Sequence, residues 1–193
     1  MVVMHVARLA VIADLPAPAY PYVVASKDGT HYFKMLPDPK DPFAANNRGT
    51  GVAYEVTKNG RDKVLWRVSG WYALSTFISN DGKYLVRMGN WSPREPSAEH
   101  LAIAFYENGK LIKRYSPLDV LEDPSRAPRS VSHYRWLKNL NGFYKETEMF
   151  SFVTVEDIEY TFDVTTGKLL FKEPAKGIGV SLHVGGFSLY GIA

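Results

Sequence analysis

Residues 160–171 read YTFDVTTGKLLF, and this stretch decides the fold because its pattern occurs twice earlier in the chain. Aromatic and polar residues alternate up to an acidic residue, a turn closes at Gly167, and Lys-Leu-Leu-Phe follows. Alternation on both sides of a glycine turn is typical of two antiparallel strands. Ile158–Val164 and Lys168–Lys172 are therefore predicted to pair as a hairpin.

The two earlier copies lie at residues 53–66 and 104–112, and the glycines Gly60, Gly109 and Gly167 recur about 50 residues apart. A second turn type, Asp-Gly, occurs at Gly29 and Gly82 with a similar separation. Glycine adopts the positive φ of a tight hairpin turn without steric cost. Two kinds of hairpin therefore alternate along the chain.

Two hairpins in each period of about 50 residues supply the four strands of one propeller blade, which needs neighbours to bury both its faces. The predicted fold is all-β, with about three propeller-like repeats of four-stranded antiparallel sheets. A β-sandwich is the alternative. Helix is expected only as a single turn over Ser116–Leu121, where Ser can cap, Pro suits the first position and Asp119 lies in the first turn.

The third copy, Tyr160–Phe171, resembles the repeat that closes each blade of quinoprotein (PQQ-type) β-propellers, and FISNDGKYLV at residues 77–86 resembles the Asp-Gly hairpin of other propeller repeats. Residues 66–121 resemble a group of uncharacterised bacterial proteins that are often exported. The repeat's tryptophan is present as Trp66, and Tyr115 and Phe171 are expected in its place in the other copies. The resemblance implies a repeat fold and carries over no cofactor-binding residue.

Composition excludes several classes of protein. The 193 residues are 46% hydrophobic and 22% charged, which is the ordinary globular mix and excludes disorder and coiled coil. A net charge of +3 gives no support for binding nucleic acid. Without cysteine there is no disulfide, thiolate nucleophile or cysteine-ligated metal. Residues 14–193 are therefore predicted to form a single all-β repeat domain.

The first 13 residues, Met1–Ala13, are mostly apolar and stop abruptly before a proline-rich stretch. Val11 and Ala13 occupy the positions of small residues before a signal-peptidase cleavage site, so the segment is either the remnant of a signal peptide or an extra strand. We expect a periplasmic or secreted protein on the first interpretation and a cytoplasmic one on the second. No run of 18 apolar residues occurs, so no transmembrane segment is expected.

No catalytic constellation stands out in the sequence. The five histidines are too scattered to place two imidazoles on one metal, so no metal site and no cofactor are predicted. Gly186–Tyr190 approaches a nucleophile elbow without the strand-to-helix context that this motif needs. Glu146 and Glu148 could share a strand face as a glycosidase pair, whereas Glu156 and Asp157 fall in a turn and are interpreted as solvated charges.

Two loops are the best candidates for recognition. Residues 87–100 hold Trp91 and Arg94, and residues 122–132 lead into His133 and Arg135. Loops on a rigid sheet often carry binding sites, and Trp and Arg are preferred interface anchors. The alternative for Trp91 is that it packs beneath its own loop as part of the core.

We therefore expect a noncatalytic, exported binding or scaffold protein whose partner is a protein or a glycan. The alternative is a hydrolase of glycans or peptides whose site assembles only in three dimensions. Because three modules leave open sheet edges, either the predicted strand pair Ile178–Tyr190 covers an edge or two chains associate as a homo-oligomer to close the ring.

Overall fold

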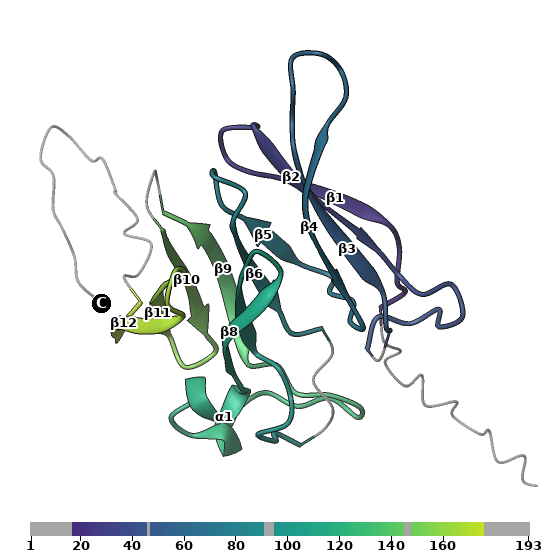
Figure 1. Cartoon of the computed structure of the whole chain (residues 1–193). Helices are drawn as coiled ribbons and strands as arrows, with labels where there is room; N and C mark the ends of the chain where they lie inside the picture. The colour runs from purple at the N-terminus through teal and green to yellow at the C-terminus, as the bar shows by residue number, and fades with distance from the viewer. Residues whose placement is uncertain (1–16, 46, 91–94, 145–147, 176–193) are drawn as a thin grey trace, which may run out of the picture.

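The computed structural model describes residues 17–45, 47–90, 95–144 and 148–175, which form three four-stranded antiparallel sheets arranged side by side (Figure 1). Each sheet is a simple meander in which consecutive strands pair. The prediction of an all-β fold with three four-stranded repeats is confirmed. The predicted segments Met1–Ala13 and Ile178–Tyr190 lie outside the described residues.

We call the three sheets the first, second and third modules. The first module contains β1 (Tyr22–Ala25), β2 (His31–Leu36), β3 (Thr50–Glu55) and β4 (Lys63–Ser69). The second contains β5 (Thr76–Ile78), β6 (Tyr84–Met88), β7 (Ile103–Glu107) and β8 (Lys110–Tyr115). The third contains β9 (Leu137–Phe143), β10 (Met149–Thr154), β11 (Ile158–Asp163) and β12 (Lys168–Pro174).

The second and third modules are joined by the expected single turn of helix, α1 (Pro117–Val120), and by a 3₁₀ turn, η1 (Pro124–Arg126). Ser116 precedes α1, and both its backbone N–H and its hydroxyl donate to Oδ2 of Asp119 at 2.7 Å. Asp119 thus accepts a hydrogen bond from the backbone N–H of Ser116, which has no partner within the helix.

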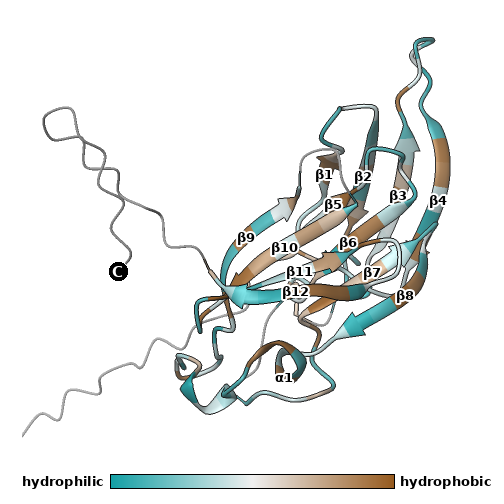
Figure 2. Ribbon diagram, turned by 90° about the vertical axis from the view of Figure 1, so that its left-hand side faces the viewer, coloured by the Kyte–Doolittle hydropathy of each residue, from teal (hydrophilic) through white to brown (hydrophobic). Residues whose placement is uncertain are grey.

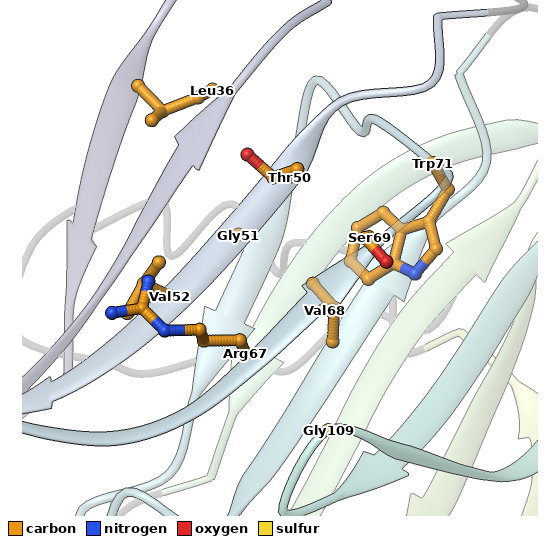
Figure 3. Close-up of a pocket in the computed structure, with 9 residues that line it drawn as sticks. All are labelled: Leu36, Thr50, Gly51, Val52, Arg67, Val68, Ser69, Trp71 and Gly109. Atoms are coloured by element: carbon orange, nitrogen blue, oxygen red, sulfur yellow. The ribbon is translucent and has the colours of Figure 1, made fainter.

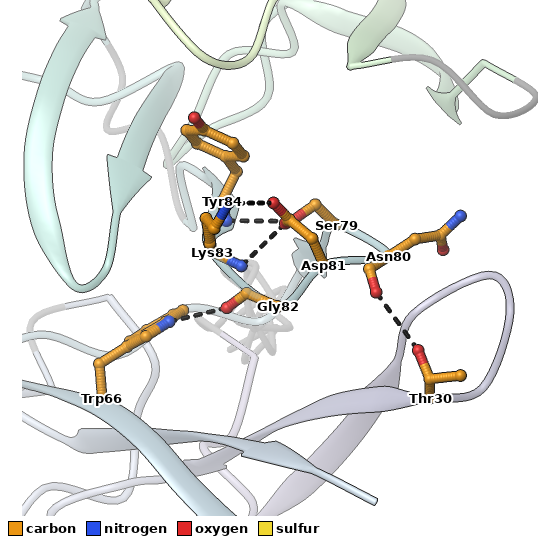
Figure 4. A network of polar contacts seen from close by, with 8 residues as sticks. All are labelled: Thr30, Trp66, Ser79, Asn80, Asp81, Gly82, Lys83 and Tyr84. Atoms are coloured by element: carbon orange, nitrogen blue, oxygen red, sulfur yellow. Dashed lines mark hydrogen bonds and ion pairs between the residues drawn. The ribbon is translucent and has the colours of Figure 1, made fainter.

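The Asp-Gly turns of the first two modules are built alike. Ser26 Oγ donates to Asp28 Oδ1 at 2.7 Å, and Ser79 Oγ donates to Asp81 Oδ1 at 2.6 Å (Figure 4). In both turns the same serine oxygen accepts the backbone N–H of the residue five positions later, at 2.9 Å. Two turns 53 positions apart in sequence therefore use one hydrogen-bonding pattern, which supports the repeat.

In each module the pairing of the third strand with the fourth is shifted once in register. The pair beside this shift shows which residues occupy the same position in the three modules. Beside this shift, Ala53 pairs with Trp66, Phe105 pairs with Lys113, and Thr161 pairs with Phe171. The prediction that Tyr115 takes the place of Trp66 in the second copy is wrong, because Lys113 occupies that ladder position. The turn between β3 and β4 is longer than the turn between β7 and β8. Counting residues from the turn glycine therefore did not identify the equivalent position in the second module.

The first and second modules each pack against a turn glycine of the module that follows. A Cβ added to Gly109 would lie 3.3 Å from the Trp66 ring and 2.7 Å from the carbonyl oxygen of Arg67. A Cβ on Gly167 would lie 2.5 Å from Lys113. Glycine is required at these two turns both by positive φ and by the closeness of the preceding module.

Two hydrophobic cores lie between the modules. Phe33, Met35 and Ala53 of the first module meet Leu85 of the second, and all four side chains are fully buried. The second core combines Phe105 with aromatic residues of the third module and with the linker: Tyr134, Trp136, Phe150, Phe152, Tyr160 and Phe162. Full burial of each such side chain stabilises the fold by about 1.5–3 kcal/mol. The alternation of hydrophobic and hydrophilic residues along the strands is visible in Figure 2.

Candidate functional site

The structure brings two of the four predicted site residues together. His133 and Arg135 line a pocket of about 240 Å³ beside Gly89 and Asn90. Its other lining residues are Tyr134, Trp136 and Leu137. Trp91 and Arg94 lie outside the described residues, so their predicted roles and the alternative core position of Trp91 stay predictions. We call this cavity the loop pocket.

The segment that carries His133 folds back on itself. Arg129 and Tyr134 form an antiparallel bridge, and the N–H of Arg135 donates to the carbonyl oxygen of Pro128 at 2.9 Å. Ser130 Oγ lies 2.7 Å from His133 Nδ1. The same oxygen accepts the backbone N–H of His133 at 3.2 Å. These local bonds fix the imidazole at the pocket wall.

Arg129 connects the two candidate loops. Its guanidinium donates to the carbonyl oxygens of Ser125 at 2.8 Å and Pro124 at 3.2 Å, which holds the 3₁₀ turn against the segment before His133. Its Nη2 also lies 3.9 Å from a carboxylate oxygen of Glu95, on the other loop. Arg129 is therefore a structural connector, and the loops predicted separately from the sequence lie beside each other.

Asn90 makes the opposite wall rigid. Its Oδ1 accepts the N–H of Leu74 at 2.7 Å, and its Nδ2 donates to the carbonyl oxygens of Ala44 at 2.7 Å and Tyr72 at 2.9 Å. One side chain thus joins a loop of the first module to the start of the second. The loop pocket is consequently bounded by fixed backbone on both sides.

A larger cavity was not foreseen from the sequence. It has a volume of about 600 Å³ and lies along β3 and β4, with Trp71 and Gly109 on the side of the second module (Figure 3). The guanidinium carbon of Arg87 lies 4.3 Å from the centroid of the Trp71 ring, a cation–π contact. The sequence offered one signal for this cavity, which is that Trp71 directly follows Ser69-Gly70 at the end of a strand.

Carboxylates gather at a third cavity, of about 210 Å³, lined by residues of all three modules. Asp81 and Glu148 are both part of its wall. Burial raises the pKa of Glu148, and the nearby Asp81 and Asp163 raise it further. Burial also acts to raise the pKa of Asp81, but hydrogen bonds from Ser79 and Lys83 outweigh it, so this pKa lies below its usual value.

Two of the other carboxylates considered from the sequence, Glu156 and Asp157, have structural partners. Glu156 accepts the backbone N–H groups of Glu122 at 2.8 Å and Asp123 at 2.7 Å. Asp157 pairs with Lys138. Both residues lie in the turn between β10 and β11, as predicted, but they were interpreted as solvated charges, and these contacts give them structural partners. Glu146 lies outside the described residues, so its pairing with Glu148 stays a prediction.

The described residues form neither a metal cluster nor a helix that could span a membrane. Within residues 17–45, 47–90, 95–144 and 148–175, no three His, Asp or Glu side chains gather closely enough to hold a metal ion. None of the helices in the described part of the chain has the length and the apolar run needed to cross a bilayer.

No protein family matches this sequence, and no curated protein matches it. The residues around the three cavities therefore have to be interpreted from their own chemistry.

Proposed function

We propose that this chain is a noncatalytic, exported binding protein that recognises an acidic glycan at the loop pocket. The observation that carries the proposal is the meeting of His133 and Arg135 with Gly89 and Asn90 in one pocket. Arg135 supplies a permanent positive charge and paired N–H donors, which suit a carboxylate. Export is part of the proposal and rests on the apolar run Met1–Ala13.

The surroundings of the pocket support binding rather than reaction. Ser130 and His133 are within hydrogen-bonding distance, but they are three residues apart in one tight turn. The serine oxygen also accepts backbone N–H groups of this turn. The pair is therefore explained by the folding of its own loop, and it supports recognition by a prearranged imidazole.

The test is a titration of the protein with oligogalacturonate, with neutral galactose oligomers as the comparison. We expect binding of the acidic oligomer, and at least a tenfold loss of affinity in Arg135→Gln, which equals about 1.4 kcal/mol. Arg61→Gln, at an exposed arginine of the β3–β4 turn, is the matched control. Equal affinity in both variants would remove the loop pocket from the proposal.

A second function, hydrolysis of glycans, is favoured by one observation. Asp81 and Glu148 line the same cavity, and their surroundings move their pKa values in opposite directions. Such separation is what a general acid paired with an ionised carboxylate requires. Release of reducing sugar from polysaccharides, abolished in Glu148→Gln, would establish this function in place of the first.

A further inference from the structure

The packing between modules has a direction, because each module presents one face forward and receives its predecessor on the other. We call the face that is turned toward the following module the forward face, and the opposite one the rear face. The forward face carries the fourth-strand residue that pairs beside the register shift, which is Trp66, Lys113 or Phe171. Trp66 meets the turn of Gly109, and Lys113 meets the turn of Gly167. Indole Nε1 of Trp66 also donates to the carbonyl oxygen of Gly82 at 2.7 Å, and Tyr115 donates to that of Gly167 at 2.8 Å.

The forward face of the third module has no following module among the described residues. Phe171 stands at the Trp66 position and remains 57% exposed. Glu159 and Glu173 pair directly across β11 and β12, two positions from the Thr161–Phe171 pair, so all four residues lie on one face. This terminal forward face is therefore acidic around one exposed aromatic ring.

The rear face of the first module is open in the corresponding way. Gly60 occupies the same turn as Gly109 and Gly167, yet no atom lies within 4 Å of the place its Cβ would take. Val23, Lys34, Val52 and Arg67 form one cross-strand row on this face, opposite the buried row of Phe33 and Trp66. Lys34 and Arg67 are exposed, and Val23 is 57% exposed.

We propose that a second copy of this chain covers both surfaces. The acidic forward face of the third module of one copy packs on the basic rear face of the first module of the other, with Phe171 against the Gly60 turn. This contact continues the packing that the chain already makes twice between its own modules. The charges oppose the two symmetric alternatives, because Lys34 and Arg67 would repel each other head to head, and Glu159 and Glu173 tail to tail.

Two such contacts close the assembly. Two copies supply six modules, which is within the four to eight that closed propellers have. A head-to-tail contact that closes leaves neither terminal face exposed, whereas one that does not close would form a filament. The proposed assembly is therefore a dimer with two identical contacts.

Sedimentation velocity across a dilution series provides the test, and we expect the unmodified chain to be a dimer. Two variants disable one side each: Phe171→Asp changes the forward face, and Lys34→Glu with Arg67→Glu changes the rear face. Each variant alone is expected to be a monomer, because every contact needs one intact surface of each kind. Leu118→Asp, at an exposed side chain of α1, is the control and should remain a dimer.

Mixing the two variants distinguishes this contact from a symmetric one. An equal mixture retains one intact forward face and one intact rear face, so it should form a heterodimer. A rear-face variant that still dimerises alone would show a tail-to-tail contact and overturn the proposal. A monomeric unmodified chain, as expected if residues 176–193 of the same chain cover the face, would overturn it too.

Discussion

The indole Nε1 of Trp66, on the last strand of the first module, donates a 2.7 Å hydrogen bond to the carbonyl oxygen of Gly82, in the first turn of the second module (Figure 4). Thr30 makes a second connection between these modules, from its hydroxyl to the carbonyl oxygen of Asn80 at 3.3 Å. The modules are thus joined by polar contacts at the turns as well as by the apolar core beneath them.

Trp66→Phe keeps an aromatic ring in the core and removes the donor to Gly82. The carbonyl oxygen is left without this partner in a buried position, so we expect the free energy of unfolding to fall by about 1.5 kcal/mol. Urea denaturation measures it. An unchanged midpoint would show that the hydrogen bond contributes nothing to the contact between modules.

Gly109→Ala and Gly70→Ala form a matched pair, because both glycines have positive φ, at 79° and 84°, and no atom lies within 4 Å of the place a Cβ on Gly70 would take. An alanine at either site costs about 1 kcal/mol in backbone strain. Only at Gly109 does the new Cβ also meet the backbone of the preceding module, which adds about 2 kcal/mol. Thermal unfolding should therefore separate the two variants clearly; equal losses would contradict the packing of Trp66 and Arg67 on Gly109.

Asn90→Asp preserves the acceptor for Leu74 and replaces the amide that donates to two carbonyl oxygens. The carboxylate cannot donate a hydrogen bond to the carbonyl oxygens of Ala44 and Tyr72. We therefore expect the free energy of unfolding to fall by about 3 kcal/mol at neutral pH. Chemical denaturation of Asn139→Asp, at an exposed site, supplies the comparison. A loss no greater than in the control would argue against Asn90 as the connector of the two modules.

Glu148 makes stability depend on pH. Because burial holds the pKa of its carboxyl above the value of 4.5, the folded protein binds more protons than the unfolded chain as the pH rises past 4.5. Stability therefore falls with rising pH over this range. Asp81 and Asp163 strengthen the effect and Lys83 opposes it.

Glu148→Gln should accordingly raise the free energy of unfolding at pH 7 and flatten its decline above pH 4.5. Urea denaturation at a series of pH values measures both changes. Glu99→Gln, at an exposed side chain, should leave the slope as it is. A steeper decline of stability with pH in Glu148→Gln would show that the fold lowers the pKa of Glu148 and would contradict this assignment.

The repeated hairpins could be predicted because each depends on local sequence. Glycine at Gly29, Gly82 and Gly167 adopts positive φ, and alternating side chains flank each turn. β9 had no comparable signal, because Asn139 and Asn141 interrupt its apolar pattern and its ladder with β10 shifts register twice. That Lys113 occupies the position of Trp66 depends on how the strands pair. This register could not be predicted from the sequence, because the turns that join the strands differ in length.

The candidate site was predictable only in part. His133 and Arg135 were proposed because loops beside sheets often bind ligands, and the structure places both in one pocket. The cavity beside Trp71 and the cavity shared by Asp81 and Glu148 arise from packing between modules. Sequence spacing carries no information about contacts between residues that are so far apart in the chain.

Amide hydrogen exchange in Gly109→Ala tests most directly the claim that the modules shelter one another. The substitution lies in the second module, and its new methyl group meets Trp66 and Arg67 of the first. We predict faster exchange in β4 as well as in β7 and β8, with no such effect on the second module in Gly60→Ala. Faster exchange confined to β7 and β8 would contradict the account.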